Sequence, residues 1–305
     1  SSIILTIGGD NPVWTGVGSQ TWTTAATNDN TGPNAWALKN GHTPTNFWAN
    51  DSVEFNDTYN LTPSGEVTVS NSTVTIHGGV APANVTFNNT TSVDYVIASD
   101  DSTGITTGAL SKNGDGIVTL NTTNTYTGPT VIAAGTLRLG DGTTNGDIAS
   151  SSSIANDGTL ILNRSTGSFS YANVISGFGS VVKNGTGTQI FSGSNTYSGG
   201  TTINGGTLQI GGGGTTGTLG SGAIINDAAL VFNLTNGVVQ GTDFGFIEGA
   251  GSVTQAGSGA VTFSFGNTYS GGTNITSGSV IVAATDALGT GSVTLAGGTL
   301  SGTTA

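Results

Sequence analysis

The sequence has no cysteine and no methionine, and only 7% of its 305 residues are charged. Without cysteine, the chain can form no disulfide and offers no thiol nucleophile. Its five basic residues and net charge of −12 exclude the Lys and Arg clusters that nucleic-acid binding requires. The sequence also has no apolar run near the length of a membrane span and no stretch with the apolar period of a helix.

Glycine is abundant instead, with 52 residues, and it is the last residue of a five-residue motif, the repeated phrase, that occurs three times. The phrase Asn-Thr-Tyr-Ser/Thr-Gly begins at Asn124, Asn195 and Asn267, and the spacings of its copies are 195 − 124 = 71 and 267 − 195 = 72. A fixed period of this kind predicts stacked structural repeats. It argues against a catalytic site, because catalysis needs different residues that converge at one place.

A shorter spacing runs inside each repeat. Apolar residues recur there in two tracks whose spacings lie between 21 and 23: Leu137, Leu160, Val181 and then Leu208, Leu230, Val253; and Ile132, Ile154, Ile175 and then Ile203, Ile224, Ile247. These spacings predict three coils of about 24 residues per repeat. We therefore expect an all-β chain folded as a β-solenoid, in which Asn side chains at successive corners form hydrogen-bonded ladders.

The first third of the chain differs from the rest, because it contains all four tryptophans and both histidines. We expect an irregular Trp-rich cap to cover the end of the solenoid. The predicted parts are an N-terminal strand at residues 1–9, the cap at 10–50, irregular first coils at 51–111, and the regular solenoid at 112–305, with repeats starting at residues 112, 183 and 255.

The stretch that begins at Lys183, KNGTGTQIFSGSNTYSGGTTINGGTLQI, resembles the passenger-associated transport repeat, also called the autotransporter-associated β-strand repeat. Looser copies begin at Lys112 and Gln255. The opening of the chain, with Trp14, Trp22 and Trp36, is similar to that of large bacterial surface proteins with these repeats. The resemblance implies a right-handed β-helix on the cell surface or outside the cell, after removal of a signal peptide, with no particular activity.

The two ends of the chain suggest self-association. The last strand of the third repeat would lie beyond Ala305, and an uncapped coil presents unpaired backbone groups that accept a strand. The apolar segment at residues 1–7 is either the first strand of its own domain or a donor strand for a neighbouring copy. In the second case the donor face consists of Ile3, Ile4, Leu5 and Ile7, and the receiving coil contains Leu295 and Leu300.

The function expected first is therefore structural: the subunit of a head-to-tail surface filament whose partner is the same chain. The alternative is a monomeric adhesin or passenger that binds glycans or cells. A polysaccharide lyase or hydrolase, with Arg138, Asp141 and Asp147 as candidates, is a third hypothesis. The repeats explain these three residues as turn and surface positions, so we expect no enzyme.

Two smaller questions concern metals and aromatic rings. We expect no cofactor, but carboxylates such as the pair Asp100–Asp101 can bind Ca²⁺, as can the set Asp51, Glu54 and Asp57. Turn formation is the simpler interpretation of these acids, and His42 and His77 are expected in a loop and a turn. The four tryptophans, Trp14, Trp22, Trp36 and Trp48, either stack on sugars or form a miniature core, and their close spacing favours the core.

Overall fold

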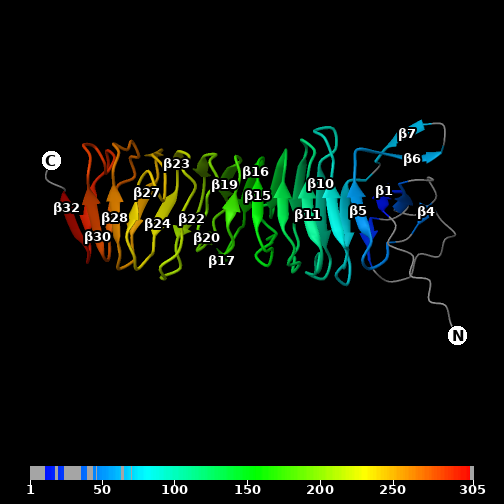
Figure 1. Ribbon diagram of the computed structural model, residues 1–305, viewed down its shortest axis with the longest axis horizontal. Helices are drawn as coiled ribbons and strands as arrows, with labels where there is room; N and C mark the ends of the chain where they lie inside the picture. The colour runs from blue at the N-terminus through cyan, green and yellow to red at the C-terminus, as the bar shows by residue number, and fades with distance from the viewer. Residues whose placement is uncertain are drawn as a thin grey trace. The chain divides into compact units, whose positions relative to one another are not determined.

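The computed structural model describes residues 11–17, 20–23, 36–39, 44–45, 47–62, 65–69 and 71–302. All the regular structure in these ranges is β, and stacked parallel strands form a β-solenoid, as the sequence predicts (Figure 1). In the same ranges, no helix is long and apolar enough to span a membrane. The chain divides into two compact units. Unit 1 consists of Ser1–Arg138 and Gly146–Ser152, and unit 2 consists of Leu139–Asn145 and Ser153–Ala305.

Unit 1 has two main parallel ladders, because strands one coil apart in the sequence pair side by side. The first ladder contains β5 (Ser52–Phe55), β9 (Asn84–Phe87), β11 (Ala109–Lys112) and β13 (Thr130–Ile132). The second contains β2 (Thr21–Trp22), β8 (Thr73–Ile76), β10 (Tyr95–Ser99), β12 (Ile117–Leu120) and β14 (Thr136–Leu139). A separate antiparallel hairpin joins β6 (Thr58–Thr62) to β7 (Gly65–Thr68).

Three short strands cover the first coil of unit 1. They are β1 (Pro12–Trp14), which is parallel to β5 and antiparallel to β3 (Trp36–Leu38), and β4 (Pro44–Thr45), which is antiparallel to β3. The centroid of the Trp36 ring on β3 lies 5.0 Å from that of Trp14 on β1 and 5.6 Å from that of Trp22 on β2, in edge-on contacts. The three tryptophans are at most 2% exposed and continue onto Phe55. This aromatic core closes the end of the coil.

Unit 2 repeats the same architecture with more regular coils. One ladder pairs β15 (Ile154–Asn156) with β18 (Ile175–Ser176). A second contains β16 (Thr159–Asn163), β19 (Ser180–Asn184), β21 (Thr201–Ile203), β23 (Ile224–Asn226) and β26 (Ile247–Glu248). A third contains β17 (Ser168–Tyr171), β20 (Thr188–Phe191), β22 (Thr207–Ile210), β24 (Ala229–Phe232), β27 (Ser252–Gln255), β29 (Thr273–Ile275) and β31 (Val293–Leu295). A fourth contains β25 (Val238–Val239), β28 (Ala260–Phe263), β30 (Ser279–Val282) and β32 (Thr299–Gly302).

The strand register corrects the coil length expected from the sequence. Along the second ladder of unit 2, Val181 pairs with Thr201, Thr201 with Ile224 and Ile224 with Ile247. The three successive coils therefore contain 201 − 181 = 20, 224 − 201 = 23 and 247 − 224 = 23 residues, and their combined length is shorter than one repeat. Val253, one repeat after Val181, accordingly lies in the third ladder and not in the second. Each repeat spans three coils plus one side of the next.

The side chains of the ladders alternate between the interior and the surface, as period-2 strands require. Inward residues such as Leu160, Leu208 and Leu230 are fully buried. Outside, the Asn ladder predicted for the corners is present in both units: Asn88 donates to Asn56 at 2.9 Å and receives from Asn113 at 3.1 Å, and Asn204 donates to Asn184 at 2.8 Å. The ladders tie neighbouring corners together through side-chain amides.

Candidate functional site

The asparagine of the repeated phrase connects three successive coils. Asn195 Oδ1 accepts the backbone N–H of Ile175 at 2.8 Å, and its Nδ2 donates to the carbonyl of Thr218 at 2.8 Å. Asn124 makes the same two contacts with Ile105 and Asp147, both at 2.9 Å. Asn267 does so with Ile247 at 2.8 Å and Ala287 at 2.6 Å. The side chain thus supplies hydrogen bonds that a regular strand would supply from its backbone.

The tyrosine and a following threonine form a second recurrent contact. The hydroxyl groups of Tyr197 and Thr201 lie 2.7 Å apart in the interior, and the pairs Tyr126–Thr130 and Tyr269–Thr273 repeat the contact at 2.7 and 2.6 Å. Burial raises the pKa of Tyr197 to about 12. The three threonines are buried on β13, β21 and β29, and the sequence analysis did not expect them in the core. It missed them because a polar residue inside a thin core needs a specific partner to be tolerated.

The glycine of the phrase allows two coils to approach closely. A Cβ atom on Gly199 would lie 2.3 Å from the carbonyl oxygen of Gly179, and one on Gly128 would lie 2.2 Å from that of Gly108. Neither position tolerates a side chain without a backbone shift. In the later Gly-Thr-Leu segment, Gly206 has φ +65°, which disfavours any other residue as well.

A buried amine or amide holds the corner that begins each repeat. Lys183 is 1% exposed, and its Nζ donates to the carbonyl oxygens of Asn184, Gly185 and Gly205 at 2.6, 2.9 and 3.0 Å. Burial, with the nearby charge of Arg164, lowers the pKa of Lys183 to about 8. Lys112 donates to Gly114 in the same way, and burial lowers its pKa too. In the third repeat Gln255 takes this role.

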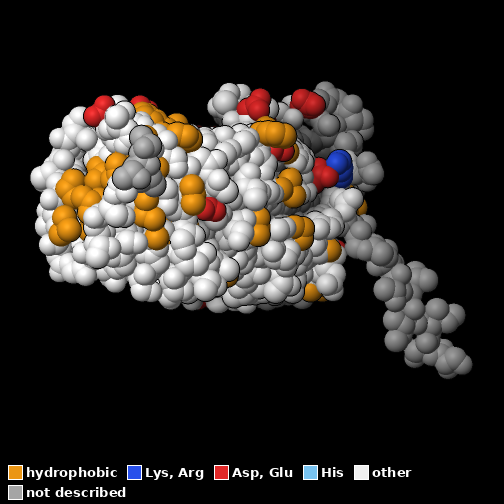
Figure 2. Space-filling model, turned by 60° about the vertical axis from the view of Figure 1, so that its left-hand side comes forward, with side chains coloured by type: hydrophobic (Ala, Val, Ile, Leu, Met, Phe, Trp, Pro, Cys, Tyr) orange, Lys and Arg blue, Asp and Glu red, His pale blue; other side chains and the backbone are white. Residues whose placement is uncertain are grey.

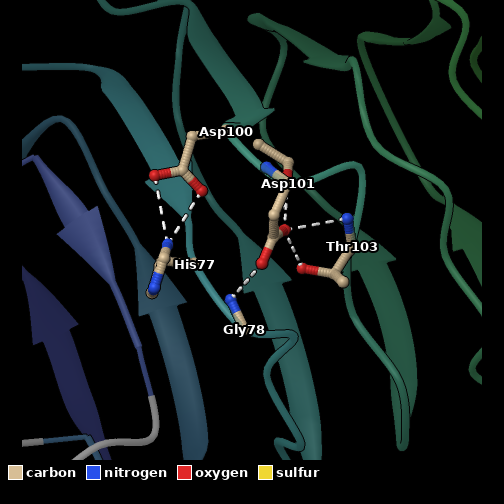
Figure 3. Close-up of polar contacts among 6 residues, drawn as sticks. His77, Gly78, Asp100, Asp101 and Thr103 are labelled. Atoms are coloured by element: carbon tan, nitrogen blue, oxygen red, sulfur yellow. Dashed lines mark hydrogen bonds and ion pairs between the residues drawn. The ribbon is translucent and has the colours of Figure 1, made fainter.

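These recurrent residues are buried and bonded to the solenoid itself, so they stabilise the fold and offer nothing to a ligand. A candidate site must therefore be sought among residues that do not recur. The clearest set lies in unit 1, before the first repeated segment, where His77 follows β8 and Asp100 and Asp101 follow β10 (Figure 3). All three side chains are exposed, and one ligand atom of each lies within 4.8 Å of the others.

Hydrogen bonds fix the arrangement of this cluster, as Figure 3 shows. His77 Nδ1 lies 3.0 and 3.1 Å from the two carboxylate oxygens of Asp100, and this contact raises the pKa of His77. Asp101 Oδ1 accepts from both the backbone N–H (3.0 Å) and the hydroxyl of Thr103, and Oδ2 accepts from Gly78 N at 2.8 Å. These donors, Thr103 first, hold the pKa of Asp101 well below its usual value.

The structure does not bring the other predicted calcium ligands together. The Asp51 carboxylate accepts the N–H of Trp48 at 2.7 Å, and Glu54 forms an ion pair with Lys39 at 2.5 Å. Asp57 binds the backbone and hydroxyl of Thr90 at 2.8 and 2.5 Å. Each acid therefore has a separate contact, and the only group of three potential ligands within the described residues is the His77 cluster.

The residues proposed for a polysaccharide enzyme also occupy turns and surface positions. Asp141 Oδ1 accepts the N–H groups of Thr143 and Thr144 at 2.8 and 2.7 Å, and Asp147 accepts that of Ala149 at 2.9 Å. Arg138 is half-buried on β14. These contacts match the turn interpretation, because Asp carboxylates commonly cap the backbone two residues on.

Of the four tryptophans, only Trp48 presents a face to solvent. It is 54% exposed, whereas Trp14, Trp22 and Trp36 are buried in the aromatic core. A sugar cannot stack on a buried ring, so any glycan contact through these residues falls to Trp48. A hollow of about 360 Å³ in the same unit, the cap hollow, is lined by Val13, Ala37, Leu38, Lys39, Asn56, Thr58, Tyr59 and Glu66.

The residues proposed for a subunit interface fall into two groups. Ile3, Ile4, Leu5 and Ile7, like His42, lie outside the described residues. Leu295 and Leu300 lie on β31 and β32, the last strands of their sheets in the described part of the chain. They are 55% and 40% exposed, and Figure 2 shows hydrophobic side chains gathered over this end of unit 2. The equivalent of Leu300 one repeat earlier, Leu230, is fully buried beneath Val253.

A comparison with known families identifies the repeated module. The model described as the Passenger-associated-transport-repeat matches residues 110–139, 181–210 and 253–282. The chain contains three passenger-associated transport repeats. Each passenger repeat begins just before the corner held by Lys112, Lys183 or Gln255 and includes the phrase whose asparagine connects three coils. The resemblance stated from the sequence is confirmed.

A curated relative agrees with this assignment. Over 80 residues the chain is 46% identical to the adhesin BmaC autotransporter of Brucella suis biovar 1 (strain 1330). The matched segment is 26% of this chain and 2% of that protein. No solved structure matches the chain.

Proposed function

We propose that the chain is an adhesive segment of a bacterial surface passenger, in which the solenoid is a non-enzymatic scaffold outside the cell. The observation that carries this proposal is the triple passenger repeat, whose recurrent residues are all committed to joining coils. The similarity to an autotransporter adhesin supports the same role. Of the three functions weighed from the sequence, the comparisons favour the adhesin over the filament subunit.

Ligand contact in this proposal belongs to the non-repeating part of unit 1. That part contains the exposed Trp48 ring and the cap hollow, where apolar residues such as Leu38 stand beside polar ones such as Lys39 and Glu66. An exposed aromatic face and a hollow of mixed polarity each suit a glycan, because sugars have both apolar faces and many hydroxyl groups. The regular coils carry this region without taking part in recognition.

The test displays residues 1–305 on a Gram-negative host, between a signal peptide and a translocating barrel, and measures adhesion to glycan-coated surfaces. We expect protease-accessible protein on the cell surface and adhesion that falls with Trp48→Ala. The matched control is Phe178→Ala, which removes a ring that is 83% exposed in unit 2 and should leave adhesion unchanged. Surface display without adhesion to any glycan or cell type would refute the adhesive role.

Filament formation by strand addition is a second candidate, and the observation that favours it is the exposed apolar edge of β31 and β32. A parallel strand from another copy could cover Leu295 and Leu300, as β27 covers Leu230. Electron microscopy and light scattering of residues 1–305 and 8–305 test it. Filaments from the longer chain and monomers from the shorter one would support strand addition, and monomers from both would exclude it.

A further inference from the structure

The His77 cluster stands apart from the solenoid's recurrent chemistry. The structural contacts of the passenger repeats return at each copy, whereas His77, Asp100 and Asp101 lie before the first matched repeat at residue 110 and have no counterpart in later ones. One imidazole and two carboxylates meet there across adjacent coils, since β8 pairs with β10 and the three residues follow these two strands. Stacking of the coils does not require this combination.

The geometry of the cluster matches metal coordination. Two ligands of a tetrahedral zinc ion, each at about 2.1 Å from the metal, are separated by about 3.4 Å. His77 Nδ1 and Asp100 Oδ1 are 3.0 Å apart, so they can occupy neighbouring coordination positions with little movement. We infer that His77, Asp100 and Asp101 bind one divalent first-row transition ion, with zinc as the representative, at the exposed edge between two coils.

Asp101 is prepared for this role by its neighbours. Oδ1 is used by donors from Ser99 and Thr103, which orient the carboxylate. Among the described residues, Oδ2 accepts only the N–H of Gly78, so it retains a lone pair for the ion. The exposure of all three residues leaves the remaining coordination positions to water.

The choice of ion follows from the ligands. Imidazole suits zinc, copper and nickel, whereas calcium takes oxygen ligands almost exclusively and needs six to eight of them. A histidine with two carboxylates therefore selects against the calcium considered from the sequence. A bound ion would tie the loop after β8 to the loop after β10 and so stabilise the first coils against local unfolding.

The test is calorimetric titration of the full chain with zinc chloride and, separately, calcium chloride. We expect one zinc per chain, an upward shift in thermal unfolding temperature with zinc, and no saturable calcium binding. His77→Ala and Asp100→Asn should weaken zinc binding at least about 10-fold, the loss that even outer-shell changes produce at metal sites. Both variants should fold, because the ion pair that they remove is exposed.

The chain provides a matched control, since His42 is its only other histidine. His42→Ala should bind zinc with unchanged affinity, and in NMR spectra zinc should shift the His77 imidazole resonances alone. Zinc binding that survives His77→Ala, or that disappears in His42→Ala, would overturn the assignment. So would the absence of saturable zinc binding by the full chain.

Discussion

The buried Lys183 gives the sharpest prediction about the fold, because the chain supplies its own replacement. The third passenger repeat has Gln255 at the same inward position, with its Nε2 donating to Gly257 and Gly259 at 2.8 and 2.9 Å. In Lys183→Gln, the amide should therefore keep donors at the corner and remove the charge. Lys183→Met has a similar length but no donor, so it separates the effect of the charge from that of the hydrogen bonds.

The direction of the pH effect follows from the pKa. In the folded chain the pKa of Lys183 is about 8, below its ordinary value of 10.5, because burial disfavours the charged amine. Below pH 8 both folded and unfolded chains carry the proton, and the wild type bears the full cost of burying the charge. As pH rises from 8 toward 10.5 the unfolded chain still binds the proton that the folded chain has released, so this cost disappears.

The magnitude can be bounded. The whole pKa difference corresponds to about 3 kcal/mol, and water near the corner screens part of it. We expect the free energy of unfolding of the wild type to rise relative to Lys183→Gln by about 1–2 kcal/mol between pH 7 and pH 10. Lys183→Met should show the same pH dependence as Lys183→Gln, because neither side chain titrates. It should be less stable than Lys183→Gln by about 1–3 kcal/mol, because it leaves backbone carbonyls without a donor.

The assay is urea unfolding of the three proteins at several pH values, followed by circular dichroism. Ionisation of the buried tyrosines is common to all three chains and cancels in the differences. A difference between wild type and Lys183→Gln that does not change with pH would refute the argument about the buried charge. Equal stability of the Gln and Met variants would refute the role of the donor at the corner.

Three further predictions concern the repeated phrase. Asn195→Ala removes both hydrogen bonds of a buried amide and should lower the free energy of unfolding in urea by about 2–4 kcal/mol. The control Asn204→Ala, on the exposed Asn ladder, should lower it by less than about 0.5 kcal/mol. Similar losses in the two variants would contradict the role of Asn195. Gly199→Ala should prevent native folding because its Cβ meets a carbonyl oxygen at 2.3 Å, while Gly214→Ala, with nothing within 4 Å, should leave the thermal unfolding temperature unchanged or raise it slightly. Tyr197→Phe should lower the free energy of unfolding by about 1 kcal/mol at pH 8. The raised pKa of Tyr197 stabilises the wild type below pH 10, and this contribution is lost as pH rises toward 12, so the difference between the two proteins should shrink above pH 10. A difference that stays constant to pH 11.5 would disprove this prediction.

Much of the candidate site was visible in the sequence only as a set of residue types. His77 and the pair Asp100–Asp101 were each noticed, and the separation 100 − 77 = 23 is close to the expected coil length, but the coils at residues 51–111 were expected to be irregular, so their register was not predicted. The register that pairs Ile76 with Ser99 brings them together. The set Asp51, Glu54 and Asp57 is closer in sequence yet separate in space, because each acid is used by a different part of the fold.

The sequence by itself determined the fold class and the repeat. A fixed period, alternating apolar residues and scarce charge leave a stacked β-structure as the way to bury a thin core along a polar chain. The tertiary structure decided the length of the coil. Along the second ladder of unit 2 a coil is shorter than a third of the repeat, so Val181 and Val253 lie in different ladders. It also placed threonine and lysine inside the core. The sequence could not show either feature, because coil length depends on backbone register and a buried polar group depends on partners from other coils.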